Sequence, residues 1–153
     1  MNTLTSLDYA RLIQYVAQRF HRQMLNKTQV NKILFAVYGR YLAQTGELLF
    51  VNETPRAWPY GPVFPLVNKR ININEVVTFT EDKIELFKEN RTAQEIVVKA
   101  VKQMYYKTAQ ALTDESHAPG TPWDKTIHLP DGTYAPWNTE IPTQYIAEYF
   151  SRA

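Results

Sequence analysis

Apolar side chains recur at helical spacing in two segments near the start of the chain, residues 5–20 and 29–46. The first stripe comprises Tyr9, Leu12, Ile13, Val16, Ala17 and Phe20, and the second comprises Val30, Ile33, Leu34, Val37, Tyr41 and Leu42. Thr5 or Ser6 is suited to cap the first segment and Thr28 the second, because short hydroxyl side chains accept hydrogen bonds from the first turn of a helix. The pattern predicts two helices whose apolar stripes are buried.

The next apolar runs are shorter. Residues 75–79 ("EVVTF") and 83–87 ("KIELF") lie on either side of a polar link, and such short alternating runs favour a two-stranded β-hairpin. The alternative is a helical turn over residues 81–90.

Helical spacing returns in residues 92–108 and 109–117. Four apolar residues then form one side of a short closing helix: Tyr145, Ile146, Tyr149 and Phe150. We therefore expect a mainly α fold, a compact single domain over residues 1–153 with about five or six helices and a small β-hairpin.

Two stretches rich in proline and aromatic residues interrupt this pattern. They are "WPYGPVFP" at residues 58–65 and "APGTPW" at residues 118–123. Proline lacks a backbone donor and fixes φ, so neither stretch is expected in a helix interior or a central strand. Pro62 could occupy the first turn of a short helix over residues 62–70, where its missing N–H costs no internal hydrogen bond.

The composition is that of an ordinary globular protein, with 44% apolar and 21% charged residues among 153. The chain has no cysteine, which excludes disulfides, thiolate metal ligands and a cysteine nucleophile. Asp8 and Arg11 interrupt the apolar stretch that a signal peptide would need, and no run reaches the roughly 18 residues of a membrane span. We expect a cytoplasmic protein that does not span a membrane.

The charge is uneven along the chain. Residues 1–70 contain nine Lys or Arg and three Asp or Glu, a net charge of +6, which leaves −4 for the remainder of a chain with net charge +2. A basic half with ten tyrosines in the chain would suit a nucleic-acid-binding regulator. However, several tyrosines fall on the buried stripes and no basic recognition helix is evident, so nucleic acid is not the expected partner.

The sequence contains no convincing catalytic set. The five glycines are scattered singly, which disfavours a phosphate-binding loop, and Ser116 and His117 are adjacent, so their side chains diverge. His117 is expected instead to tie the end of its helix to the "PGTPW" loop, residues 119–123, through its ring nitrogens. A metal site could be drawn from Asp114, Glu115, His117, Asp124 and His128, so a metal-dependent hydrolase or nucleotide-modifying enzyme centred on His117 remains an alternative. We assign no catalytic residue, metal or cofactor.

The two interruptions carry a family resemblance. "LNKTQVNKILFAVYGRYLAQTGELLFVNETPRAWPYGPVFPLV" is followed after about 50 residues by "ALTDESHAPGTPWDKT", and this order resembles the Panacea, or SocA-like antitoxin, domain of bacterial and phage toxin-antitoxin loci. The matching signature positions are Trp58, Tyr60, Gly61, Pro62, Val63, Pro65, Leu112, His117, Pro122 and Trp123. Ser116 stands where the family commonly has threonine, and the "APG" insertion lengthens the approach to Pro122.

The resemblance implies an antitoxin that neutralises a separately encoded toxin by direct contact, and not an enzyme. One type of family member also acts as an adaptor that delivers the toxin to a cellular protease, so the resemblance allows this second role. The two signatures could form a mutual structural lock or could contact the partner directly. Basic residues of the N-terminal helices are then the candidates for contacts with the toxin: Arg11, Arg19, Arg22, Lys27, Lys32 and Arg40.

Overall fold

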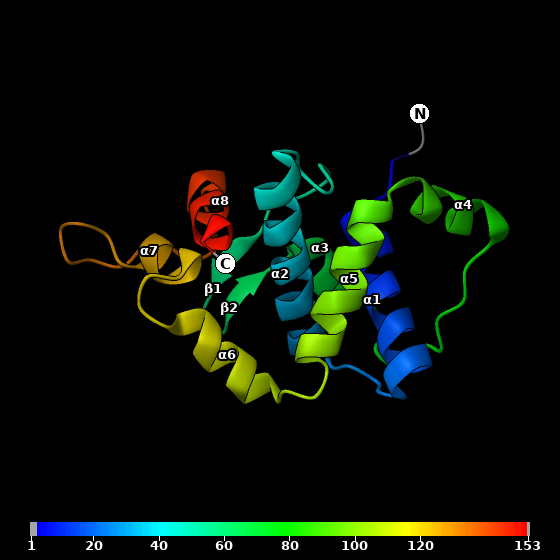
Figure 1. Ribbon diagram of the computed structural model, residues 1–153. Helices are drawn as coiled ribbons and strands as arrows, with labels where there is room; N and C mark the ends of the chain where they lie inside the picture. The colour runs from blue at the N-terminus through cyan, green and yellow to red at the C-terminus, as the bar shows by residue number, and fades with distance from the viewer. Residues whose placement is uncertain (1–2, 153) are drawn as a thin grey trace.

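The computed structural model describes residues 3–152 and is mainly α-helical, as predicted. It has eight helices in this range, more than the five or six expected (Figure 1). The helices are α1 (Ser6–His21), α2 (Lys27–Thr45), α3 (Pro65–Arg70), α4 (Glu81–Glu89), α5 (Arg91–Met104), α6 (Ala109–His117), α7 (Pro122–Ile127) and α8 (Thr143–Ser151). The strands are β1 (Arg56–Trp58), β2 (Gly61–Val63) and β3 (Thr139–Glu140).

The first two helices begin at side-chain caps. Thr5 caps α1 in a reciprocal arrangement with Asp8, which confirms the first predicted cap. The predicted cap of α2 at Thr28 is wrong, because Asn26 accepts from the backbone of Gln29 while the Gln29 side chain accepts from Asn26. Helix α2 therefore begins two residues earlier than predicted and includes Lys27 and Thr28.

The helix α2 lies in the middle of the molecule (Figure 1). It packs against α1 and α5 on one side and against α6 and α8 on the other. Because α2 is enclosed from both sides, its buried residues extend well beyond a single stripe and include polar ones. Beside it, the rings of Tyr38, Phe50 and Phe64 pack with centroids 5.1 to 5.5 Å apart and join the two sides of the core.

The small sheet lies elsewhere than the sequence pattern predicts. Strand β1 is central in the order β2-β1-β3, and both pairings are antiparallel. The first proline-rich stretch thus contains the end of β1 and all of edge strand β2, where Pro62 needs no donor. The expectation that this stretch forms no central strand was wrong for Trp58, the last residue of β1.

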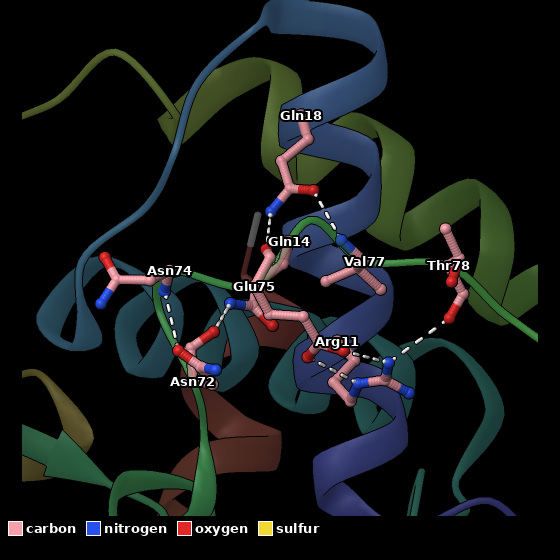
Figure 2. A network of polar contacts seen from close by, with 8 residues as sticks. All are labelled: Arg11, Gln14, Gln18, Asn72, Asn74, Glu75, Val77 and Thr78. Carbon is pink, nitrogen blue, oxygen red and sulfur yellow. Dashed lines mark hydrogen bonds and ion pairs between the residues drawn. The ribbon is translucent and has the colours of Figure 1, made fainter.

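The hairpin predicted over residues 75–79 and 83–87 is wrong. Residues 72–78 run along α1, and their backbone is held by its side chains instead of by a second strand (Figure 2). Gln14 Nε2 donates to the Asn72 carbonyl at 2.9 Å, and Gln18 both donates to the Glu75 carbonyl and accepts from Val77 N at 3.0 Å. Residues 81–89 form α4 behind a Thr80 cap, which is the helical alternative.

Two prolines start short helices near the two interruptions. Helix α3 begins at Pro65, three residues after the proline predicted for that position. Pro122 is the first residue of α7, so the second interruption ends inside a helix that the pattern did not predict. Helix α3 packs on α1 and α2, and α7 packs on α6, α8 and β1.

Candidate functional site

The two proline-rich stretches contact each other through their tryptophans. Trp123 Nε1, on α7, donates a 2.7 Å hydrogen bond to the backbone carbonyl of Trp58, at the end of β1. The Trp58 indole in turn donates to Asn138 Oδ1 at 2.8 Å and stacks on Trp137. The stretches are thus joined across 65 residues of sequence, and Trp137 and Asn138, in the loop before β3, contact the Trp58 side chain.

His117 joins this junction by its ring face. The imidazole stacks on the Trp123 indole with ring centroids 3.9 Å apart and an interplanar angle of 16°. Its Nε2 atom is buried and has no hydrogen-bond partner among the described residues. His117 therefore ties the end of α6 to the loop as expected, but it does so by stacking on Trp123 and not through Nε2. Burial, followed by the nearby charge of Lys32, lowers the pKa of His117 and favours the neutral ring.

Gly61 allows the two signatures to approach α2 closely. Its φ of +113° belongs to the region that favours glycine. A Cβ at this position would lie 2.5 Å from Ser116 Oγ and 2.9 Å from Lys32 Cε. The residue type at position 61 is therefore fixed by both backbone conformation and space.

Lys32 is buried at the centre of these contacts. Only 5% of its surface is exposed, and its ammonium donates to the Pro62 carbonyl at 3.3 Å. Burial lowers the pKa of Lys32 from 10.5 to about 8, so the side chain is still mostly protonated at neutral pH. We call Lys32, Trp58, Gly61, Pro62, His117 and Trp123 the signature cluster.

A cavity of about 420 Å³ opens beside the signature cluster. Its walls come from α2, the end of α5, α6, α7 and α8, and Lys32 and Pro62 belong to its lining. Phe35, Trp123 and Phe150 supply apolar surface, and Arg40 supplies a second cation. The volume is within the range of small-ligand sites, about 300 to 1,000 Å³.

The comparison with family models agrees with this geometry. The model described as "Antitoxin SocA-like, Panacea domain" matches residues 30–124. The chain belongs to this family. The match runs from α2 to α7, which are the elements that carry the signature cluster. Searches of curated proteins and of solved structures found no match.

In this Panacea domain, the six basic candidates lie in three different environments. Arg11 is bound to the 72–78 segment, with Nη2 at 2.8 Å from Glu75 Oε2 and 3.3 Å from the Thr78 carbonyl (Figure 2). Lys32 and Arg40 line the cavity. Lys32, which the sequence offered as a candidate for toxin contact, is therefore not exposed, because α2 is enclosed at that position. Only Arg19, Arg22 and Lys27 are exposed.

Two exposed apolar side chains lie between the three exposed cations in the sequence, at the connection between α1 and α2. Phe20 is 67% exposed, although the helical pattern assigned it to the buried stripe, and Met24 is 46% exposed. Among residues 3–152, none of the three cations has a carboxylate within ion-pair distance. We call Arg19, Phe20, Arg22, Met24 and Lys27 the basic turn.

The groups proposed for catalysis in the Panacea domain are not assembled. Ser116 Oγ donates to the Thr113 carbonyl at 2.8 Å, within its own helix, and His117 stacks on Trp123. Asp124 and His128 pair with each other at 2.9 Å. Across residues 3–152, no group of three His, Asp or Glu side chains is placed to hold a metal ion. The same range contains no helix that is both long and apolar enough to cross a membrane.

Among the other signature residues, Tyr60 and Pro122 differ in exposure. Tyr60 is 71% exposed at the β1–β2 turn, whereas Pro122 is buried in the cavity wall. Sequence reasoning missed Asn138, which receives the Trp58 hydrogen bond, and the role of Lys32 in the cluster. No spacing pattern could have found Asn138, but the breadth of the apolar pattern in α2 was a usable signal for Lys32.

Proposed function

We propose that this protein is the antitoxin of a toxin-antitoxin pair and that it neutralises its toxin by direct protein contact. Membership of the SocA-like Panacea family is the observation that carries the proposal, because it points to an antitoxin role and to a toxin as partner. A non-enzymatic role fits the signature cluster, in which the Trp123 indole donates to the Trp58 carbonyl and the His117 ring stacks on Trp123.

We infer that residues 1–153 act as one domain, although the family match covers residues 30–124. The described parts outside the match, notably α1 and α8, pack on α2. Residues from all three helices belong to one hydrophobic core. Removing either flanking helix would expose a large part of α2, so both are needed for the folded antitoxin.

The basic turn is the surface that we propose for toxin contact. Phe20 and Met24 provide apolar area, and Arg19, Arg22 and Lys27 supply exposed positive charge beside them in the sequence. Aromatic, methionine and arginine side chains are enriched at protein interfaces. Such a surface is complementary to an acidic toxin surface with an apolar centre, and its charges would speed association.

Growth rescue with the neighbouring toxin tests the function. The toxin gene encoded beside this one is expressed alone and with the antitoxin, and growth and co-purification are measured. We expect wild type to restore growth and to co-purify with the toxin. A toxin that is lethal alone, and that is neither suppressed nor bound, would show the proposed function to be wrong.

A double variant tests the surface in the same assay. Phe20→Ala with Arg22→Ala should reduce rescue and co-purification, because an exposed aromatic and its neighbouring cation are lost. Tyr134→Ala with Lys125→Ala is the matched control, since it removes an exposed aromatic and an exposed cation elsewhere. If both variants rescue growth equally well, the toxin binds another surface.

A further inference from the structure

Three cations and an apolar wall line the cavity beside the signature cluster, and two of the cations, Lys32 and Arg40, have no ion-pair partner among residues 3–152. Lys32 and Arg40 lie on one face of α2, eight residues apart, which corresponds to about 12 Å along the helix axis. Phe35 lies between them in the sequence, and Trp123 and Phe150 complete the apolar lining. A ligand in this space would meet positive charge and aromatic surface together.

Neither cation is compensated by a carboxylate. Among residues 3–152, no carboxylate lies within 4 Å of either side chain. The ammonium of Lys32 has one acceptor, the Pro62 carbonyl, and the Arg40 guanidinium donates to Gln103 Oε1 at 2.8 Å. Glu115, the only acid among the described residues that line the cavity, is paired with Lys107 at 2.8 Å.

Two cations without counter-ions make the unliganded cavity energetically unfavourable. A buried ammonium without a counter-ion loses hydration that one carbonyl at 3.3 Å does not replace. An anion in the cavity would restore charge-assisted hydrogen bonds to this group. A polar pocket for water alone would need no second cation and no aromatic wall.

We propose that the cavity binds an organic anion, with a carboxylate or phosphate group held by Lys32 and Arg40 and an apolar body packed against Phe35, Trp123 and Phe150. Two sources have this chemistry: a free small molecule, and an acidic side chain of the toxin beside an apolar one. Binding of a free anion is independent of the proposed function, and only the second source rests on it.

Titration of the purified protein with model anions tests the site. The probes are phenylbutyrate and phenyl phosphate, and phenylbutanol is the uncharged control. We expect saturable shifts of backbone amide signals in α2, α6 and α8 and a rise in melting temperature with the anions. Phenylbutanol should bind about tenfold more weakly or not at all. Equal binding of the alcohol, or no saturable binding of either anion at millimolar concentration, would overturn the proposal.

Variants on α2 locate the binding. Lys32→Met and Arg40→Gln should each weaken binding of phenylbutyrate about tenfold, because each removes one charge that contacts the anion. Lys27→Met is the matched control, since Lys27 is an exposed lysine on the same helix. Lys32→Met that binds as tightly as wild type would place the anion elsewhere and overturn the assignment.

Competition with the toxin distinguishes the two sources. If a toxin side chain occupies the cavity, phenylbutyrate should compete with the toxin and Lys32→Met should weaken the complex. If the antitoxin–toxin complex still binds phenylbutyrate, the ligand is a free anion. Should no toxin bind at all, the proposed function fails, while the probe titration still decides whether the cavity binds anions.

Discussion

The basic turn and the cavity both carry cations, but water surrounds the cations of the turn and protein surrounds those of the cavity. Arg19, Arg22 and Lys27 are exposed, so their charges cost the folded state little. Lys32 is 95% buried and has no carboxylate partner among the described residues. The difference indicates that residues of the turn can change with little effect on folding, whereas residues around the cavity are tightly coupled to the fold.

Truncating one large aromatic residue in each region should give the largest contrast. Trp123→Ala removes the stacking on His117 and the 2.7 Å hydrogen bond to Trp58, and should lower the free energy of unfolding by about 3 kcal/mol. Phe20→Ala, at a 67% exposed side chain, should change it by less than about 0.5 kcal/mol. Urea denaturation of both variants measures the contrast, and equal losses would contradict it.

A methyl group at Gly61 should be the next most damaging change. Gly61→Ala must accommodate a Cβ 2.5 Å from Ser116 Oγ at a φ of +113°, and we expect a loss of about 2 kcal/mol. Gly132→Ala is the matched control, because Gly132 also has positive φ but no neighbouring atom within 4 Å. Its loss should be about 1 kcal/mol, from backbone strain alone. Thermal or urea unfolding measures both variants. Equal losses in the free energy of unfolding would contradict a steric role of Gly61.

Replacing the buried lysine should stabilise the protein. Lys32→Met removes an ammonium whose hydration is lost on folding, so the free energy of unfolding at pH 7 should rise by about 1 to 2 kcal/mol. Lys27→Met, at an exposed position of the same helix, should change it by less than about 0.5 kcal/mol. Destabilisation by Lys32→Met would mean that the hydrogen bond to Pro62 outweighs the cost of burial.

The same variant has a pH signature. The pKa of Lys32 is about 8 in the folded protein and 10.5 as its ordinary value, so the unfolded chain binds more protons between these two pH values. The free energy of unfolding contributed by Lys32 therefore rises with pH across this window, and the penalty is complete below pH 8. The advantage of Lys32→Met over wild type should accordingly shrink between pH 8 and 10, as followed by urea denaturation.

The smallest expected difference concerns arginine residues of α1. Arg11→Ala removes the contacts with Glu75 and Thr78 and should cost about 0.5 to 1 kcal/mol. Arg19→Ala, at an exposed arginine that lies over the Tyr15 ring, should cost less than about 0.5 kcal/mol. Added salt should reduce the cost of Arg11→Ala, since screening weakens its ion pair with Glu75.

The periodic part of the sequence predicted the fold better than the irregular part. The apolar stripes predicted α1, α2 and α5 correctly, because a buried helix face repeats its apolar residues every turn. The hairpin prediction was wrong because glutamine side chains of α1, and not a neighbouring strand, bind the backbone of residues 72–78. Such side-chain contacts have no period in the sequence.

Around the site, the signature residues were visible as a pattern but their partners were not. Proline, glycine and tryptophan marked both stretches, yet the contact of Trp123 with the Trp58 carbonyl depends on tertiary packing. Lys32 was a candidate for toxin contact because a lysine is usually exposed, but its side chain is buried. Phe20 was assigned to the core because it continues the stripe, but the chain turns away at Arg22, where φ is +51°.

The affinity of the purified protein for its toxin, measured by isothermal titration calorimetry, tests the proposed function most directly. We predict specific binding by wild type and about 100-fold weaker binding by a variant with Arg19, Arg22 and Lys27 changed to Ala. The matched control changes Lys99, Lys125 and Arg152 to Ala and should bind like wild type, because these exposed cations lie outside the basic turn. No binding by wild type would contradict the antitoxin proposal, and equal binding by all three proteins would contradict the assignment of the surface.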